Sequence, residues 1–123
     1  MVNDFGMLAV KAEPGKIVLV KVKDIVSLRA AGNYVELYFD EGRALHRATM
    51  HSIVKRLPSY FVQIHRSHVI NLQHLKVVQS ELGRYSECIM SDGRQLPIGA
   101  QFKGAFMDAL GTADDLLEDG GTS

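Results

Sequence analysis

Short apolar runs separated by turn-forming residues, about every eight to twelve positions, most strongly constrain what this chain can fold into. In the run 34–39, Val35, Leu37 and Phe39 fall on one face of a strand, and Tyr or Glu occupies the other face. This alternation is typical of a strand with one side in the core and one side in solvent. Turn-forming residues flank the run at 31–33 and 40–42, so we expect the chain to reverse direction at both ends.

The rest of the chain repeats this pattern and adds little helix. Further strands are expected over residues 17–22, 25–28, 43–47, 74–79, 85–90 and 95–98. Thr49 is a candidate N-cap for a short helix that Pro58 ends, and apolar residues at helical spacing predict a second helix over 102–110. The sequence therefore predicts a mainly β fold: small antiparallel β-sheets, one short helix after the first sheet region, and one C-terminal helix.

The zero net charge of the 123 residues conceals a separation of charge. Residues 14–107 hold 13 Lys and Arg against 7 Asp and Glu, whereas residues 108–123 hold five acidic residues and no basic one. A basic body suits a polyanionic partner, because Lys and Arg that neutralise phosphates release condensed counterions. An ordinary solvated surface is the alternative. Residues 111–123 have no usable periodicity, so an acidic, disordered tail is predicted there.

Length, cysteine content and hydropathy indicate how many domains the chain has and in which compartment it works. A chain of 123 residues accommodates one domain. The single cysteine, Cys88, lies in a strand-like run, which favours a core thiol over a redox sensor. No apolar run approaches the roughly 20 residues of a membrane span, and the start of the chain lacks the features of a signal peptide. We therefore expect a cytoplasmic protein without membrane contact.

The segment 63–72, QIHRSHVINL, is the main candidate for chemistry. His65 and His68 suggest a metal, but residues three apart share a face only on a helix, and no third ligand lies close in sequence. Ser67 beside histidines suggests a nucleophile, but a triad is defined by geometry, and no Gly-x-Ser-x-Gly elbow is present. Arg66 offers five donors in a planar fork that suits guanine or a phosphate. Nucleic-acid binding therefore ranks above a metal or hydrolytic site, and no cofactor is predicted.

Three separate segments together resemble the LytTR family of bacterial DNA-binding domains. They cover residues 24–35 (DIVSLRAAGNYV), 61–72 (FVQIHRSHVINL) and 92–98 (DGRQLPI). Their order and spacing agree with the family, and the central signature, Phe-x-x-Ile-His-Arg-Ser-x-x-Ile-Asn-Leu, is specific. The resemblance spans about residues 7–110, which we predict to be the DNA-binding domain, between an N-terminal extension at 1–6 and the acidic tail at 111–123.

The resemblance implies a LytTR-like fold without a recognition helix, in which loops between strands enter successive major grooves of promoter DNA and bend it at direct repeats. By position, the contact residues are Ala31, Gly32, Asn33 and Tyr34 in the first segment, and His65, Arg66, Ser67 and His68 in the second. We expect Arg66 and Asn33 to read bases. For His65 and Ser67, hydrogen bonds to the local backbone are the alternative to DNA contacts. Arg29 and Lys103 are further candidates for phosphate contacts or loop support, and Asn71 matches a structural position.

The third contact region departs from the family pattern. Family members commonly carry a Ser-Arg pair after the Leu-Pro that ends the last strand, but here Ile98 is followed by Gly99, Ala100 and Gln101. Gln101 remains a candidate for reading adenine or touching a phosphate. Losing one bidentate contact predicts a cost of about 1 to 3 kcal/mol in DNA binding.

The family also implies the output domain of a response regulator, and no receiver domain precedes this segment. We expect a non-enzymatic transcriptional regulator that stands alone or is a fragment of a longer one. A homodimer on tandem sites, an inhibitory or sensor protein partner, and competition between the acidic tail and DNA are the expected modes of assembly and control. The alternatives are a protein-interaction module on the same fold, with weakened DNA binding, and a small metal-binding or hydrolytic protein.

Overall fold

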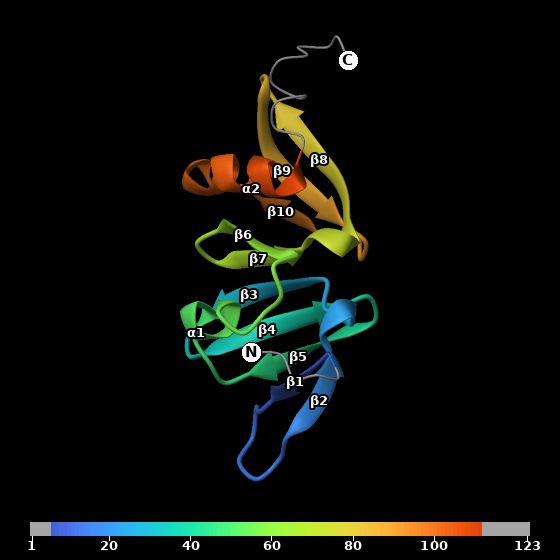
Figure 1. Ribbon diagram of the computed structural model, residues 1–123, viewed down its shortest axis with the longest axis vertical. Coiled ribbons are helices and arrows are strands. Elements are labelled where there is room, and N and C mark those ends of the chain that lie inside the picture. The colour runs from blue at the N-terminus through green and yellow to red at the C-terminus, as the bar shows by residue number, and fades with distance from the viewer. Residues whose placement is uncertain (1–5, 112–123) are drawn as a thin grey trace.

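Ten strands and two short α-helices make up residues 6–111, the part of the chain that the computed structural model describes (Figure 1). The strands are β1 (Met7–Val10), β2 (Val18–Lys21), β3 (Ser27–Ala31), β4 (Tyr34–Phe39), β5 (Gly42–His46), β6 (Phe61–His65), β7 (His68–Asn71), β8 (Leu75–Glu81), β9 (Arg84–Met90) and β10 (Gln95–Pro97). The α-helices are α1 (Met50–Val54) and α2 (Lys103–Leu110), and the 3-10 turns cover Val22–Asp24, Leu72–His74 and Ala100–Phe102.

The strands form three antiparallel sheets stacked along the long axis of the molecule (Figure 1). A two-stranded sheet pairs β1 with β2, a five-stranded sheet has the order β5-β4-β3-β7-β6, and a three-stranded sheet has the order β10-β9-β8. The predicted mainly β fold is confirmed, including the short helix after the β3–β5 region and the C-terminal helix. Thr49 caps α1 as predicted, because its side chain accepts a hydrogen bond from the Ser52 N–H at 3.1 Å.

Three of the strands were not predicted. β1 is only four residues long, and β6 and β7 form a hairpin at the segment 63–72, for which no strand was predicted. Polar residues at the hairpin turn obscure its alternation, and the pairing register shifts between Gln63 and His65. A register shift moves side chains from one face to the other, so the period-2 pattern breaks in the middle of β6.

The alternation in β4 holds for Val35 and Leu37, which are fully buried, but Glu36 on the other face is buried as well. The exposed fraction of this residue is 6%, although the sequence pattern places it toward solvent. Its carboxylate accepts hydrogen bonds from Arg29, Arg43 and Tyr38. Long neighbouring side chains therefore cover this residue. The alternation within one strand cannot predict such burial, because most of the covering side chains come from neighbouring strands.

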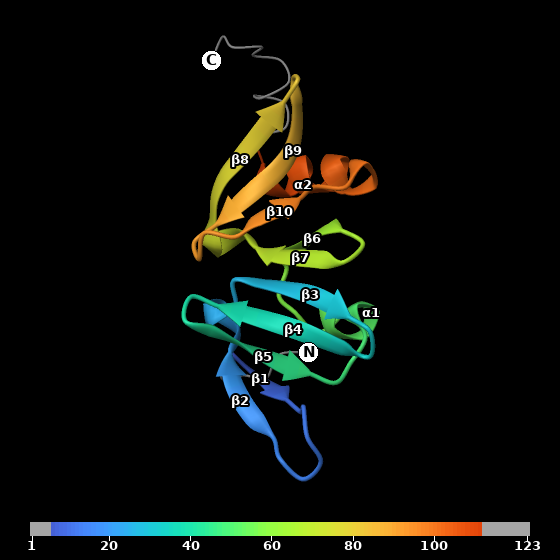
Figure 2. The same ribbon diagram turned by 180° about the vertical axis from the view of Figure 1, so that it is seen from behind.

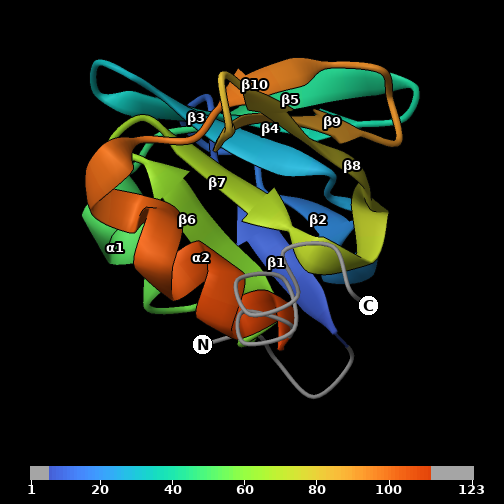
Figure 3. The same cartoon turned by 90° about the horizontal axis from the view of Figure 1, so that it is seen from above.

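The core consists of two hydrophobic clusters. The first packs α1 and the β1–β2 sheet against the five-stranded sheet, and the second packs α2 and the three-stranded sheet against β6 and β7. Figure 3 shows α2 alongside β6, where Phe106 and Ile64 belong to the same cluster. Cys88 is fully buried in this second cluster, and burial raises the pKa of its thiol to about 11. The predicted core thiol is confirmed, since a protonated buried thiol is a poor redox centre.

Asn71 is fully buried, and its side chain bonds to the backbone just before β3 and just after β7. Its side-chain N–H donates to the Ile25 carbonyl at 2.9 Å, and its side-chain oxygen accepts from the Gln73 N–H at 2.8 Å. The predicted structural role for Asn71 is thereby confirmed. The amide fixes the end of β7 against the start of β3, so it also sets where the two strands can begin and end.

The predicted acidic tail lies outside the described residues, apart from Gly111, as does the predicted N-terminal extension, apart from Gly6. Within residues 6–111, no helix is long and apolar enough to cross a membrane.

Candidate nucleic-acid interface

The three predicted contact segments lie along one side of the elongated molecule, although they are far apart in sequence. They are the β3–β4 turn, the β6–β7 turn and the segment from Gly99 into α2, and Figures 1 and 2 place all three along the same side. Two backbone hydrogen bonds connect them. The Ala30 N–H donates to the Ser67 carbonyl at 2.9 Å, and the Gly99 N–H donates to the Ile64 carbonyl at 2.7 Å. The segments therefore hold fixed positions relative to each other.

The β3–β4 turn consists of Gly32 and Asn33, because Ala31 pairs with Tyr34 across the hairpin. Gly32 has a φ of +66°, a value that suits glycine at the first position of a tight two-residue turn. Gly32 and Asn33 are exposed, while Ala31 and Tyr34 are partly buried at the strand ends. Asn33 thus stands at the tip with a free amide side chain, a group that can pair with adenine in a major groove.

The β6–β7 turn consists of Arg66 and Ser67 between the paired residues His65 and His68. The His65 Nδ1 accepts a hydrogen bond from the Ser67 N–H at 3.0 Å, which leaves Nε2 as the donor of the neutral ring. This is a local backbone hydrogen bond of the kind that we gave as the alternative to a DNA contact for His65. Arg66 is the exposed residue of the turn, so its guanidinium is available to a partner.

The third segment packs directly against the second. His65, Arg66, Gly99, Ala100, Gln101 and Phe102 line one shallow surface depression. A Cβ atom at position 99 would lie 3.2 Å from Phe102 Cδ2 and 3.7 Å from the Cα of His65, so glycine allows this close approach. Ala100 and Gln101 are exposed, and Lys103 is partly buried at the start of α2. Gln101 therefore extends the surface of the second segment, whereas Ala100 adds no polar group.

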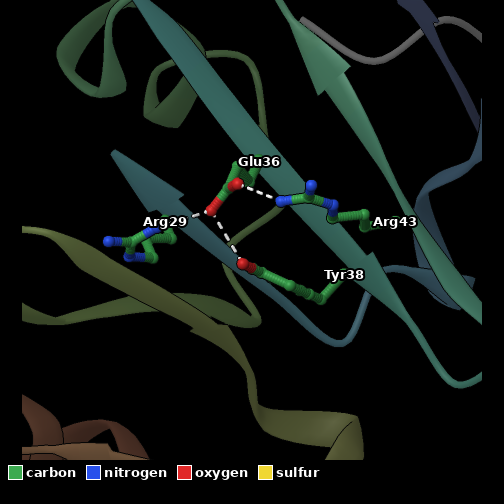
Figure 4. Close-up of polar contacts among 4 residues, drawn as sticks. All are labelled: Arg29, Glu36, Tyr38 and Arg43. Atoms are coloured by element: carbon green, nitrogen blue, oxygen red, sulfur yellow. Dashed lines mark hydrogen bonds and ion pairs between the residues drawn. The ribbon is translucent and has the colours of Figure 1, made fainter. Parts of the chain in front are cut away.

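Arg29 lies on β3 opposite His68, close to the second turn, and one nitrogen of its guanidinium bonds within the protein. Figure 4 shows Arg29, Tyr38 and Arg43 around the carboxylate of Glu36. The Arg29 Nη1 donates to Glu36 Oε1 at 2.8 Å, and the Tyr38 hydroxyl donates to the same oxygen at 2.7 Å. The hydrogen bonds from Tyr38 and Arg29 lower the pKa of the Glu36 carboxyl, and burial opposes them. Glu36 is consequently ionised at neutral pH and holds Arg29 in one position.

His68 is partly buried, and burial together with repulsion from His65, Arg29 and Arg94 lowers its pKa to about 4. The ring is therefore neutral at pH 7 and offers a hydrogen bond but no positive charge. Between pH 6.5 and pH 4, the unfolded chain binds a proton at this position and the folded chain does not. The free energy of unfolding must therefore fall as the pH is lowered through this window.

We expect this loss to reach about 1 to 2 kcal/mol between pH 7 and pH 5, measured by urea unfolding. His68→Gln should remove it, because glutamine does not titrate. Burial also lowers the pKa of His46 and acts in the same direction, so the difference between the wild type and His68→Gln isolates His68. Equal pH dependence in both proteins would show that His68 protonates freely in the folded chain.

Residues 6–111 include no group of three or more His, Cys, Asp or Glu side chains placed to hold a metal ion. The rings of His65 and His68 are neighbours, with centroids 5.3 Å apart, but the turn provides no third ligand of this kind. A protein zinc site needs at least three protein ligands. The hairpin thus brings the two histidines together without making a metal site of them.

The fold and this surface define a mainly β domain that presents an arginine, an asparagine and a glutamine on turns along one side. The model of the LytTr DNA-binding domain matches residues 15–111 of the chain. The chain therefore belongs to the LytTR family of DNA-binding domains. Membership in a family of DNA-binding domains agrees with the prediction that the chain is not an enzyme.

Two regulatory proteins and one solved structure are also similar to this chain. The transcriptional regulatory protein LytR of Staphylococcus aureus is 27% identical over 97 residues, which cover 78% of this chain and 39% of LytR. The sensory transduction protein LytT of Bacillus subtilis is 30% identical over 87 residues, which cover 70% of this chain and 36% of LytT. A solved LytTr DNA-binding domain from Bacillus cereus shares the fold, with a TM-score of 0.71 over 86% of this chain and 97% of that domain at 19% identity. The chain spans about two fifths of the length of these curated relatives.

Proposed function

We propose that the chain regulates transcription by binding double-stranded promoter DNA with sequence specificity through the three segments on its common side. The observation that supports this most directly is their convergence. Two backbone hydrogen bonds, Ala30 N–H to Ser67 O and Gly99 N–H to Ile64 O, join segments that are far apart in sequence into one continuous surface. On that surface lie the side chains that suit DNA, namely Asn33, Arg66 and Gln101.

In the proposed mechanism, the β3–β4 and β6–β7 turns enter successive major grooves. Arg66 makes a bidentate contact with guanine, and Asn33 pairs with adenine. Ala31, Gly32 and Tyr34 shape the first turn, while His65, Ser67 and His68 support the second or contact the backbone. Arg29, Gln101 and Lys103 contact phosphates. Because rigid turns must reach two grooves, the DNA bends, and flexible base steps between the contacts add to the specificity.

We further propose that residues 7–110 form the DNA-binding domain and that two chains bind as a homodimer on tandem direct repeats. An inhibitory or sensor protein partner would control this binding. The relatives named above carry regulatory or sensory transduction names and are longer than this chain, which supports a regulatory setting.

A fluorescence anisotropy titration tests the function. Fragments selected from random DNA identify the preferred site, and the full chain is titrated at moderate salt against that duplex and a scrambled duplex of equal length. We expect the selected site to be preferred by at least a thousandfold, as is usual for specific regulators. Equal affinity for both duplexes would contradict the proposal and would favour a protein-interaction module on the same fold.

Ala100→Arg should strengthen DNA binding, because it restores the arginine that family members commonly carry at this place. Position 100 is exposed and lines the same depression as Arg66, so the fold can accommodate the longer side chain. We expect a gain of about 1 kcal/mol, roughly fivefold in Kd, at the lower end of the range for a bidentate contact, since the new side chain is not held in place. Ala100→Gln is the matched control, and an equal gain from both variants would argue against a bidentate contact.

A further inference from the structure

The uncovered face of the five-stranded sheet carries a group of charged residues outside the turn surface. Val35 and Leu37 of β4 pack into the core with α1, so Glu36 and Tyr38 lie on the opposite face. Figure 2 views the molecule from behind, with β3, β4 and β5 in front of α1. We call the set Arg29, Glu36, Tyr38 and Arg43 the arginine cluster; Figure 4 shows its contacts.

The arginine cluster contains more positive charge than its carboxylate needs. Glu36 accepts from Arg29 and Tyr38 on Oε1 and from Arg43 on Oε2. One guanidinium would neutralise this buried carboxylate, so the second is in excess. A third guanidinium lies nearby, because Arg94 Cζ is 3.9 Å from the centroid of the Tyr38 ring. The arginine cluster and Arg94 therefore place three guanidinium groups around one buried carboxylate.

The two arginines of the cluster keep most of their donors free. Each contacts Glu36 through Nη1, and their side chains are 48% and 57% exposed, respectively. A guanidinium has five N–H donors, so several on each residue remain available to an external anion. Glu36, at 8% side-chain exposure, holds the two cations near each other, where they would otherwise repel.

We infer that Arg29 and Arg43 form a phosphate-binding surface, positioned by Glu36, for the DNA backbone that flanks the bases contacted by the turns. This inference rests on the proposed function. The cluster is continuous with the turn surface, because Arg29 pairs in register with His68 and the adjacent Ala30 bonds to Ser67. DNA that bends around the turns brings its flanking phosphates toward this face. A phosphate suits the site, since arginine forks match its oxygens.

The salt dependence of binding to a scrambled duplex of about 30 base pairs tests the inference, because it measures the number of phosphates contacted and requires no sequence preference. Arg43→Gln should lower the slope of log K against log salt by about 0.9, the value for one phosphate contact. Lys16→Gln is the matched control. Lys16 is an exposed, ion-paired cation 3.2 Å from Glu13 in the β1–β2 connection, and its removal should leave the slope unchanged.

Two further measurements keep the outcomes distinct. The double variant Glu36→Gln/Arg43→Gln removes one negative and one positive charge, so a global charge effect predicts an unchanged slope. A lost Arg43 phosphate contact predicts a decrease at least as large as in Arg43→Gln, because Arg29 also loses the carboxylate that positions it. The double variant also avoids leaving the carboxylate short of a partner if Arg43→Gln folds poorly. An unchanged slope in the folded double variant would overturn the inference. The preference of the wild type for its selected site is measured separately, so failure of the proposed function is recognised independently.

Discussion

Arg66→Ala is expected to weaken binding to the selected site by about 1 to 3 kcal/mol, which corresponds to a 5- to 150-fold increase in Kd. Arg66 is the exposed residue at the tip of the β6–β7 turn. The backbone on both sides of it is fixed, because the Ser67 N–H bonds to the His65 ring and the Ser67 carbonyl accepts from the Ala30 N–H. The backbone of the turn therefore loses little freedom when it binds, so the main cost of the contact is the ordering of the Arg66 side chain.

The pattern of the loss distinguishes base reading from phosphate binding. If Arg66 reads guanine, Arg66→Ala should relax the preference at one base position and barely affect scrambled DNA. If it contacts a phosphate, all duplexes should weaken equally and the salt slope should fall by about one contact. Arg66→Lys keeps the charge but removes the fork, so it should restore binding only in the phosphate case. If Arg66→Ala bound all duplexes as tightly as the wild type, Arg66 would not contact DNA.

The neighbouring third segment explains why this one residue is expected to matter so much. Ala100 shares a surface depression with Arg66 and has no hydrogen-bonding side chain. The Ser-Arg pair that family members commonly carry after the Leu-Pro of the third segment is absent here, and Gln101 is the polar side chain near that place. Discrimination therefore depends more heavily on Arg66, and the loss should lie toward the upper end of the range.

The sequence predicted the strands with clear alternation and missed those whose pattern is set by tertiary contacts. β4 and its neighbour β5 followed directly from apolar periodicity and turn residues. The β6–β7 hairpin did not, because a register shift next to His65 interrupts its alternation. The burial of Glu36 was not predicted either, because the side chains that donate hydrogen bonds to it come from β3 and β5 as well as from its own strand. Such contacts depend on strand order, which one strand's pattern does not reveal.

The candidate site was predicted through the family signature more than through local chemistry. Composition and spacing ranked nucleic-acid binding above metal binding. They could not predict that residues 31–34, 65–68 and 101–103 lie close together in space. The fold does this through strand pairing between β3 and β7 and through the close contact that Gly99 permits. Arg43 carried no sequence signal, and Arg94 had no role assigned within the segment 92–98, because each is an isolated basic residue beside a turn. Their excess charge becomes visible only when Glu36 and Tyr38 are seen between them.

Asn71→Ala should destabilise the fold by about 3 kcal/mol, the largest effect on stability that we predict. The substitution removes the side-chain partner of the buried Ile25 carbonyl and of the partly buried Gln73 N–H, and it does so at a fully buried position. Each buried polar group that loses its hydrogen bond costs about 1 to 3 kcal/mol. The unfolding temperature, measured by circular dichroism, should fall by about 10 °C.

Asn33→Ala is the matched control, because it makes the same chemical change at an exposed turn position. It should alter stability by less than about 0.5 kcal/mol, as surface substitutions usually do. In DNA binding, measured at 15 °C so that both variants remain folded, Asn33→Ala should have the larger effect. Asn33→Ala should lose the preference at one adenine position, worth about 1 to 3 kcal/mol, whereas Asn71→Ala should keep its base preferences. If Asn71→Ala lost a base preference while its thermal unfolding stayed unchanged, Asn71 would be a DNA contact and the β3–β7 junction would need another explanation.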